Sequence, residues 1–223
     1  MRIGVAIPCY EGHIAPLKKL LDSIALQTRL PDDVFISCSS CVPSEFPYVS
    51  TDYPFPFRVL THWTKQTVAQ NRNIAGAHLL DNDIITFFDA DDQMHPQRLE
   101  IIEDCFTKHD SMILVHNFDD SIASYKDFPT YNEFPYLLNQ LDRCPWGSTV
   151  LKGRPAGLQI HNGQPSIRRE VFDTIRFNES AACLTKDDTV FCTDVIVKWP
   201  SRTAYCPLKL SAYIPSYTGG FKC

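Results

Sequence analysis

The residues that decide the fold are Ile84-Ile85-Thr86-Phe87-Phe88, followed directly by Asp89-Ala90-Asp91-Asp92. The first five are mostly apolar and are branched or aromatic, which is the composition of a strand buried on both faces. In extended backbone, residues two apart point the same way, with Cα atoms about 6–7 Å apart. Asp89 and Asp91 can therefore face one ligand just beyond the end of this strand.

The position of this acidic run matters more than its spacing. A second Asp-x-Asp occurs at Asp81 and Asp83, but it precedes the strand, and we interpret it as a solvated turn. Ligands of open parallel sheets bind beyond the carboxyl ends of the strands, where Asp89 and Asp91 lie. Carboxylates placed there suit a hard divalent cation that also holds phosphate oxygens.

The N-terminal residues predict a βαβ unit. Residues 2–8 form a branched apolar run typical of a buried strand, and apolar residues then recur at helical spacing over residues 13–28. A second strand is predicted at residues 34–37, after a break at Pro31. A strand, a helix and a strand in this order predict a parallel sheet.

The pattern loosens after residue 116, where Pro, Gly, Asp and aromatic residues become frequent and predict loops with short strands up to residue 165. The other predicted elements are strands at 59–62 and 112–115 and helices at 67–80, 96–108, 166–175 and 187–197. We therefore expect one α/β domain over residues 1–223. Its first half is residues 1–116, and residues 117–223 form a second half that caps it.

The composition excludes several classes of protein. The chain has 223 residues, of which 44% are hydrophobic and 21% charged, and its net charge is -5 with no long basic run, so neither nucleic acid nor an anionic membrane is expected as a partner. No apolar stretch approaches the roughly 20 residues of a transmembrane helix. Nine cysteines, an odd number, follow no export signal, which favours reduced thiols and a cytoplasmic location.

Two of these cysteines form a C-x-x-C motif, Cys38-Ser39-Ser40-Cys41. In thiol-redox enzymes such a motif opens a helix, whose N-terminus lowers the thiol pKa. Here Val42-Pro43 and a Pro-rich loop follow instead. We expect Cys38 and Cys41 to be dispensable for the main activity, and no second cysteine pair supplies zinc-ligand spacing.

Several segments, in order, resemble the inverting GT-A glycosyltransferases of family 2. They are IGVAIPCYE at 3–11, SIALQTRLPDDVFI at 23–36, Asn71-Arg72-Asn73, FFDADDQMHP at 87–96, SIRREVFDTIRFNE at 166–179 and Lys186-Asp187-Asp188. The resemblance covers roughly residues 2–197. It implies a GT-A fold, in which helices flank a mainly parallel central sheet, with the nucleotide over the first half and the acceptor over the second.

The resemblance also implies residue roles. The residues implied to contact the nucleotide and its sugar are Pro8, Tyr10, Glu11, Ser39, Arg72, Asp89 and Ala90. Asp91 and Asp89 are implied to hold Mn²⁺ or Mg²⁺ on the diphosphate. Asp188 is implied to be the general base, with Asp187 in a supporting role. Ser39 belongs to a Ser-Cys-Ser sequence that stands where the family usually carries a base-reading Asp.

Residues on the acceptor side are assigned from their chemistry. Trp146 lies in a Pro-Trp-Gly turn, and sugar faces often stack on Trp, so acceptor contact and simple loop packing both stay open. His161, the last histidine, is a candidate beside the acceptor, the alternative being a structural polar residue. Arg168 and Arg169 have two open interpretations as well, a phosphate contact or a surface ion pair.

These features predict an enzyme that moves a hexose-type sugar from a nucleoside-diphosphate sugar, with a UDP-sugar favoured, to a glycan hydroxyl with inversion. One alternative is a nucleotidyltransferase, which needs a Gly-rich phosphate loop after the first strand, and Cys9-Tyr10-Glu11-Gly12 is not such a loop. Another is a non-catalytic sugar-nucleotide-binding module, which the presence of both Asp91 and Asp188 disfavours. A thiol-redox enzyme is the weakest alternative.

Overall fold

The computed structural model describes residues 1–122, 124–145, 147–183 and 186–214. The strands are β1 (Ile3–Tyr10), β2 (Asp33–Ser39), β3 (Phe57–His62), β4 (Ile84–Phe87), β5 (Gln93–Met94), β6 (Ile113–Asp119), β7 (Leu137–Leu138), β8 (Leu141–Arg143), β9 (Thr149–Leu151), β10 (Ser166–Arg168) and β11 (Thr203–Ala212). The α-helices are α1 (Ile14–Ala25), α2 (Val68–Ala77), α3 (Arg98–Lys108), α4 (Arg169–Thr174) and α5 (Asp187–Lys198). Short 3₁₀ helices occupy Glu11–His13, Pro43–Glu45, Ser50–Asp52, Tyr125–Asp127 and Ala181–Cys183.

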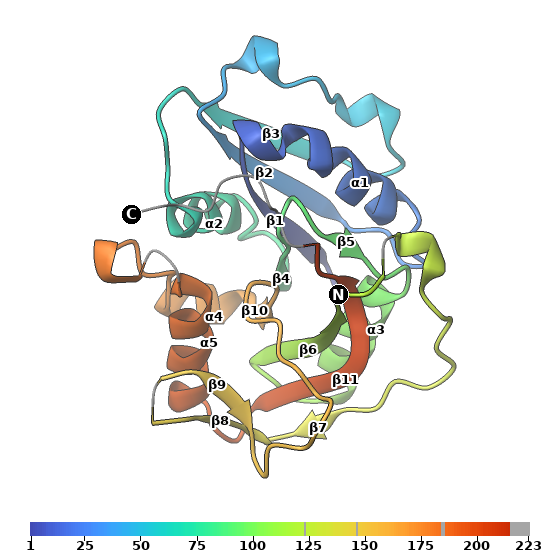
Figure 1. The fold of residues 1–223 in the computed structure, drawn as a ribbon, viewed down its shortest axis with the longest axis vertical. Coiled ribbons are helices and arrows are strands. Elements are labelled where there is room, and N and C mark those ends of the chain that lie inside the picture. The colour runs from blue at the N-terminus through green and yellow to red at the C-terminus, as the bar shows by residue number, and fades with distance from the viewer. Residues whose placement is uncertain (123, 146, 184–185, 215–223) are drawn as a thin grey trace.

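A central sheet organises the molecule, in the strand order β3-β2-β1-β4-β10-β6-β11-β5 (Figure 1). β1 pairs in parallel with β2 and β4, β2 with β3, and β11 with β6. The antiparallel members are β10, β5 and β7. The α/β class with a mainly parallel sheet flanked by helices, predicted from the sequence, is confirmed.

Side chains alternate between the two faces of the sheet, and a separate hydrophobic layer covers each face. In β1, Ile7 and Cys9 pack in one layer with residues of α1 and α3. Ala6 faces the opposite layer, which contains residues of α2, α4 and α5. This is the two-face burial that the uninterrupted apolar runs of β1 and β4 predict, because side chains of a strand point alternately to either face.

The prediction of a helix from residue 166 was wrong for its first three residues. Ser166–Arg168 form β10, which lies antiparallel between β4 and β6, and the helix begins only at Arg169. Ile167 is fully buried, and the Ser166 and Thr86 hydroxyls hydrogen-bond at 2.8 Å. Thr86, the β4 partner of Ser166, lies 80 positions earlier in the chain. Local periodicity does not detect such pairing.

β11 is a second strand that the sequence analysis did not predict. It lies between β6 and β5, and β5 follows the acidic run directly. Strands from both halves of the chain therefore alternate in one sheet. The second half also carries the β8–β9 hairpin, a separate two-stranded sheet beside α5 (Figure 1).

The Gln-Thr pair after α1 fixes the segment that carries the acidic run. Gln27 Nε2 donates to the carbonyl of His95 at 2.7 Å, and its Oε1 accepts from Leu99 N at 3.1 Å. The Thr28 amide donates to the carbonyl of Pro96 at 2.9 Å. These bonds join the end of α1 to the start of α3 and so hold the chain just after the acidic residues. Among the described residues, none of the helices combines the length and apolarity needed to span a membrane.

Candidate active site

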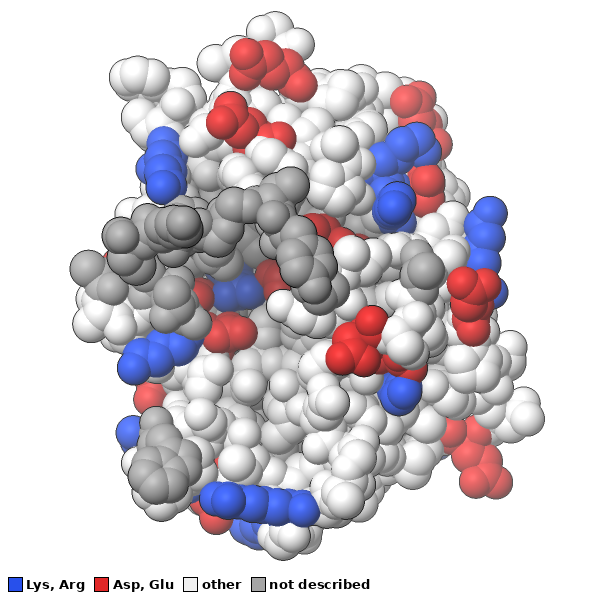
Figure 2. Space-filling model, viewed as in Figure 1, with Lys and Arg blue, Asp and Glu red and all other residues white. Residues whose placement is uncertain are grey.

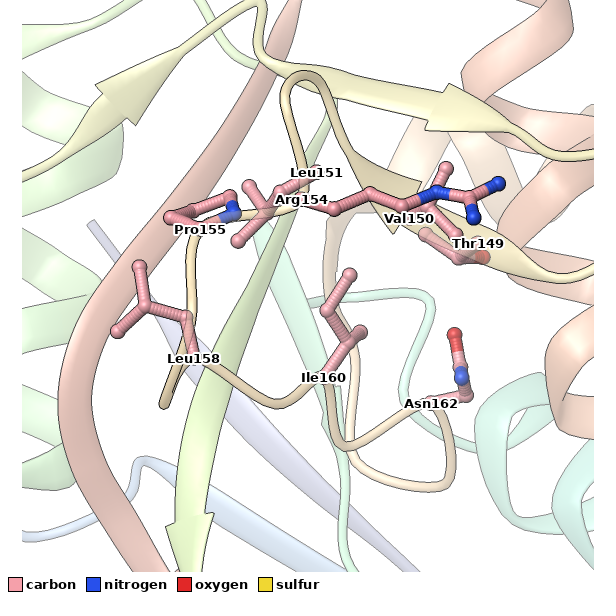
Figure 3. Close-up of a pocket in the computed structure, with 8 residues that line it drawn as sticks. All are labelled: Thr149, Val150, Leu151, Arg154, Pro155, Leu158, Ile160 and Asn162. Carbon is pink, nitrogen blue, oxygen red and sulfur yellow. The ribbon is translucent and has the colours of Figure 1, made fainter.

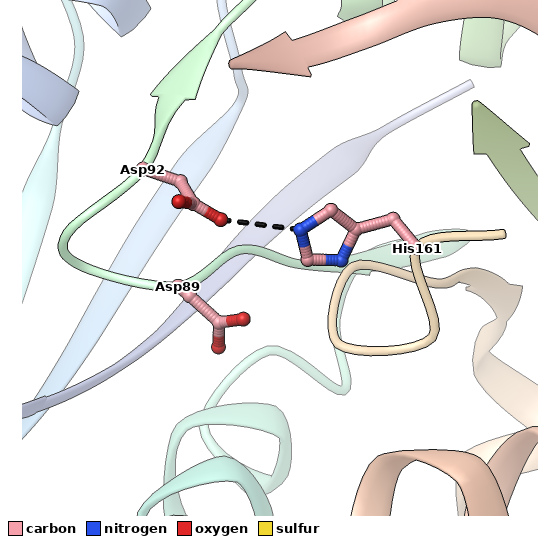
Figure 4. Close-up of side chains that lie close together, drawn as sticks. All are labelled: Asp89, Asp92 and His161. Atoms are coloured by element: carbon pink, nitrogen blue, oxygen red, sulfur yellow. Dashed lines mark hydrogen bonds and ion pairs between the residues drawn. The ribbon is translucent and has the colours of Figure 1, made fainter. Parts of the chain in front are cut away.

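Three side chains of metal-ligand type converge beyond the end of β4 (Figure 4). Asp89 and Asp92 come from the loop after β4, and His161 comes from the loop before β10. One ligand atom of each lies within 4.8 Å of the others, and His161 Nε2 lies 3.2 Å from Asp92 Oδ2. The sequence analysis placed Asp89 here but did not assign Asp92, and it assigned His161 to the acceptor.

Asp92 is almost completely enclosed, with 1% of its surface exposed. Its Oδ2 accepts from Gln164 Nε2 at 2.6 Å as well as facing His161, and its Oδ1 accepts from the Ile214 amide at 2.9 Å. Burial raises the pKa of Asp92 to about 6, against the opposing effect of His161. A nearby cation would favour the ionised form of this carboxyl group.

Arg72 joins this cluster to the start of α5. It is buried in α2; its Nη2 donates to Asp89 Oδ1 at 2.7 Å and its Nη1 to Asp187 Oδ2 at 2.8 Å. The guanidinium also lies over the Phe177 ring, 5.3 Å from the centroid. Burial opposes its charge, but Asp89 and Asp187 outweigh that effect and hold the pKa of Arg72 above its ordinary value. Arg72 is therefore a buried positive charge between the acidic run after β4 and the start of α5.

The two adjacent carboxylates of α5 differ in environment. Asp187 is buried against Arg72, and burial raises its pKa although Arg72 opposes the shift. Asp188 is half-buried, and its Oδ1 accepts from the Thr189 amide at 2.6 Å. Asp187 is thus committed to an ion pair, whereas Asp188 is the more accessible carboxylate of the two.

Gly163 closes the cluster from the second half of the chain. A Cβ at this position would lie 2.5 Å from Asp89 Oδ2 and 3.1 Å from Arg72 Nη2. A side chain would therefore displace the Asp89 carboxylate. The close approach explains why a glycine follows His161 and Asn162, and it brings the loop before β10 against the end of β4.

Asp91 points to a different partner from Asp89 and Asp92. Its Oδ2 lies 3.5 Å from His13 Nε2, and both side chains are less than one fifth exposed. The His13 ring packs on Tyr10, with centroids 4.3 Å apart. Of the two metal ligands predicted from the sequence, Asp89 lies in the three-residue cluster, while Asp91 lies at its edge beside the end of β1.

The ends of β1 and β2 are joined by Asn71 of α2. Its Nδ2 donates to the Cys9 carbonyl at 3.0 Å and to Ser39 Oγ at 3.1 Å, while its Oδ1 accepts from Ser37 Oγ at 2.8 Å. Thr67 caps α2, because its Oγ1 accepts from the Gln70 amide at 3.1 Å. The sequence analysis quoted Asn71 only as part of a motif, and this role was missed.

The remaining predicted donor residues lie at the same edge of the sheet. Pro8 pairs in register with Ser37, Tyr10 ends β1, and Glu11 is exposed at the start of the following 3₁₀ helix. Ala90 is buried within the acidic run. Figure 2 shows acidic and basic atoms together in a hollow on this face of the molecule. Trp146, predicted on the acceptor side, lies outside the described residues.

Other predicted polar groups have structural roles. Asp83 Oδ2 accepts from the Arg2 amide at 2.7 Å, so the earlier Asp-x-Asp pair lies at the opposite end of β4. Arg169 forms a surface ion pair with Asp173, and Arg168 donates to the carbonyl of Ser111 at 2.9 Å. The surface-pair interpretation therefore holds for Arg169.

A cavity of about 240 Å³ lies in the second half of the chain, between β9 and the loop before β10 (Figure 3). Its lining residues are Thr149, Val150, Leu151, Arg154, Pro155, Leu158, Ile160 and Asn162. In the described part of the chain, Thr149 Oγ1 and Asn162 Oδ1 are buried without a hydrogen-bond partner. Asn162 stands between His161 and Gly163, so this loop borders both the cavity and the carboxylate cluster.

Comparison with known structures shows which proteins share this fold. The S. aureus TarS 1-349 structure in complex with UDP superimposes with a TM-score of 0.70 at 17% identity, over 97% of this chain and 61% of that chain. TarS 1-349 in complex with UDP-GlcNAc gives 0.68 at 15% identity, over 98% and 60%. S. aureus TarS gives 0.69 at 16%, over 97% and 37%. The chain thus spans about three fifths of the TarS 1-349 structures.

The sequence itself matches a family model. No curated protein matches it, but residues 4–146 match the model of glycosyl transferase family 2. That range contains the acidic run after β4 and Arg72 of α2, whereas His161, Gly163 and Asp187 of the site lie beyond it. Together with the shared GT-A fold, this match shows that the chain belongs to glycosyl transferase family 2.

Proposed function

We propose that this glycosyltransferase moves a hexose-type sugar from a UDP-sugar to a hydroxyl group of a glycan, with inversion and with a divalent metal. The observation that carries the proposal is the Arg72 bridge. It holds Asp89, at the proposed donor side of the sheet, and Asp187, beside the candidate base, on one buried guanidinium. Asp89 and Asp187, which come from distant parts of the chain, are thereby fixed next to each other.

The nucleotide assignment is supported by the relatives that share the fold, since TarS 1-349 has been crystallised with UDP and with UDP-GlcNAc. In this chain, Ser39 stands where the family usually carries an Asp at the end of the second strand. Its hydroxyl is oriented by Asn71. Both side chains are buried, so we propose that they act on the nucleotide indirectly, by fixing the ends of β1 and β2.

The cluster beyond β4 has the donor set of a divalent metal site. Two carboxylates and one imidazole are available, and imidazole favours a transition-series ion, so Mn²⁺ fits better than Mg²⁺. Asp89, Asp92 and His161 would hold the ion, with Asp91 as the further ligand that the family resemblance implies. When bound, the ion would neutralise negative charge on the diphosphate leaving group.

Different side chains then have different roles in the proposed reaction. Asp188 accepts the proton of the acceptor hydroxyl as that oxygen bonds to the anomeric carbon, and the bond from the sugar to the diphosphate breaks on the opposite side. One base opposite one leaving group gives inversion. Asp187 and Arg72 orient Asp188 by fixing the first turn of α5. A cytoplasmic location stays a prediction from the cysteine pattern.

The proposal is tested by calorimetry with UDP, GDP and CDP, each with and without Mn²⁺. With Mn²⁺ present, we expect UDP to bind more tightly than GDP or CDP. Without Mn²⁺, we expect UDP to bind only weakly. Asp91→Asn and Asp92→Asn test separately whether each of these two carboxylates is needed for Mn²⁺-dependent UDP binding. Asp173→Asn, on the surface of α4, is the matched control. Equal affinity for the three nucleotides, or UDP affinity that ignores Mn²⁺ in the wild type, would contradict the proposal.

A further inference from the structure

The cavity beside β9 is lined by two polar atoms that the protein itself does not pair. Thr149 is 7% exposed, and within the described part of the chain its Oγ1 and Asn162 Oδ1 are both buried without a hydrogen-bond partner. Both residues line the cavity, and the Asn162 amide oxygen is directed toward Thr149 (Figure 3). A buried polar atom without a partner lowers stability, so two such atoms at one cavity indicate a ligand that pairs with them.

The rest of the lining is an aliphatic wall with an open side. The wall consists of Val150, Leu151, Leu158 and Ile160. Arg154 and Pro155 complete the lining and are exposed, so the cavity can be reached from solvent. Its volume of about 240 Å³ is below the roughly 300–1,000 Å³ of pockets that enclose drug-sized ligands, so it suits a single sugar ring with a substituent.

Asn162 connects the cavity to the candidate base. The Cys192 thiol of α5 donates to the Asn162 carbonyl at 3.5 Å. Cys192 follows Asp188 by four residues, so the two side chains lie on the same face of α5, one turn apart. In the chain, Asn162 is flanked by His161 of the carboxylate cluster and by Gly163. If Asp188 receives the acceptor proton, as the proposed function requires, the cavity lies on the side from which the acceptor approaches.

We propose that this cavity binds the acetamido group of an N-acetylated sugar in the acceptor glycan. The N–H of that group donates to Asn162 Oδ1, its carbonyl oxygen accepts from the Thr149 hydroxyl, and its methyl group packs on the aliphatic wall. One donor, one acceptor and one apolar end are thus matched within a few atoms. A hydroxyl group at the same position of the sugar would pair with the polar atoms but would leave the aliphatic wall without a contact.

Free sugars test the cavity without the nucleotide. N-acetylglucosamine and N-acetylgalactosamine are titrated into the full chain and compared with glucose and galactose, which carry a hydroxyl in place of the acetamido group. NMR follows the methyl signals of Leu151, Leu158 and Ile160, which belong to the wall. At least one acetamido sugar should shift these signals saturably. It should bind about tenfold more tightly than its parent sugar, the effect of one buried hydrogen bond together with a methyl contact.

Thr149→Val removes the hydroxyl and nearly keeps the shape of the side chain. It should abolish the preference for the acetamido sugar, while stability stays the same or rises, because that hydroxyl has no partner in the described chain. Thr203→Val, in β11, is the matched control. Thr203 Oγ1 is likewise buried without a described partner, but Thr203 does not line the cavity, so this variant should keep the preference.

The results that support and overturn the proposal are distinct. Saturable binding with a preference that Thr149→Val loses and Thr203→Val keeps supports it. Unshifted wall signals, equal affinity for acetamido and parent sugars, or an unchanged preference in Thr149→Val overturns it. If Thr149→Val does not fold, Asn162→Ala, at a partly exposed position, takes its place and should lose the preference.

An acetamido group also occurs in nucleotide-sugar donors, so a second measurement distinguishes the two sources. Calorimetry with Mn²⁺ compares UDP-GlcNAc with UDP-glucose, and Thr149→Val should weaken the binding of neither. A selective loss of UDP-GlcNAc affinity in this variant would assign the acetamido group to the donor and overturn the proposal. If the wild type binds neither nucleotide sugar, the proposed function fails, while the free-sugar titration still shows whether the cavity binds an acetamido group.

Discussion

Arg72 and Asp187 lie 115 residues apart in the chain and form a buried ion pair, with Nη1 and Oδ2 separated by 2.8 Å. Because the other terminal nitrogen of Arg72 holds Asp89, one guanidinium links α2, the end of β4 and the start of α5. This link fixes the acidic run after β4 and the first turn of α5 relative to each other. A planar group with several donors can serve two carboxylates at once, which a lysine ammonium does less well.

Replacing Arg72 tests this link. Arg72→Met should lower the free energy of unfolding by about 3–5 kcal/mol, because it leaves two carboxylates without their buried partner. Arg169→Met is the matched control, since its ion pair with Asp173 is exposed, and it should change stability by about 0.5 kcal/mol or less. Urea unfolding measures both. Similar losses for the two variants would show that the Arg72 network does not stabilise the fold.

Asp188→Asn tests the assignment of the base. Turnover should fall by about 10²–10⁴-fold, because the acceptor hydroxyl loses its proton acceptor. The affinity for UDP with Mn²⁺ should stay nearly unchanged, since the nucleotide is held elsewhere. Steady-state kinetics and calorimetry give the two values.

Asp187→Asn is the comparison for this prediction. We expect it to reduce stability through the loss of the pair with Arg72. If Asp187→Asn abolishes turnover in a folded protein while Asp188→Asn stays active, the two roles are reversed. If both variants stay active, the base is a different residue.

Gly163→Ala should disturb the cluster of Asp89, Asp92 and His161 without unfolding the protein. Its Cβ would displace Asp89 Oδ2, so we expect Mn²⁺-dependent UDP affinity to fall by about 10–100-fold, as when the support of a metal ligand is altered. In Gly76→Ala, the new Cβ would meet the Phe172 ring in the core and should cost about 1–3 kcal/mol of stability. Calorimetry and thermal unfolding distinguish the two. Unchanged metal affinity in Gly163→Ala would contradict the close approach.

His95 should make stability depend on pH. Burial lowers its pKa to about 4, and the neutral ring accepts from the Gln97 amide at Nδ1 and faces the Pro129 carbonyl at Nε2. Its contribution is complete above pH 6.5 and is lost as the pH falls toward 4, because only the unfolded chain binds the proton there. The loss amounts to about 3 kcal/mol.

The measurement compares urea unfolding of the wild type and His95→Gln between pH 7 and pH 4. The variant lacks the ring contacts with Tyr131 at every pH, so only the change in the difference between the two proteins is informative. That difference should shrink as the pH falls. A difference that stays constant would show that His95 binds its proton equally well in the folded and unfolded states.

Much of the first half could be predicted because its signals are local. The apolar runs at β1 and β4 and the helical spacing of α1 need no knowledge of distant residues, and the structure confirms them. β10 and β11 were missed because both are strands only through pairing with β4, β6 and β5. Ser166–Arg168 run into a helix without a break, so a pattern read along the chain extends the helix over them.

The candidate site divides in the same way. The sequence alone determined that an acidic run follows the most apolar strand, and hence that carboxylates gather at the carboxyl edge of a parallel sheet. Only the tertiary structure decided that His161, 69 positions away, faces Asp92, that Arg72 joins Asp89 to Asp187, and that Cys9 pairs in register with Cys38. The physical reason is that apolar runs and helical periodicity depend on neighbours along the chain, whereas strand pairing and the burial and pairing of charges depend on which elements meet when the sheet assembles.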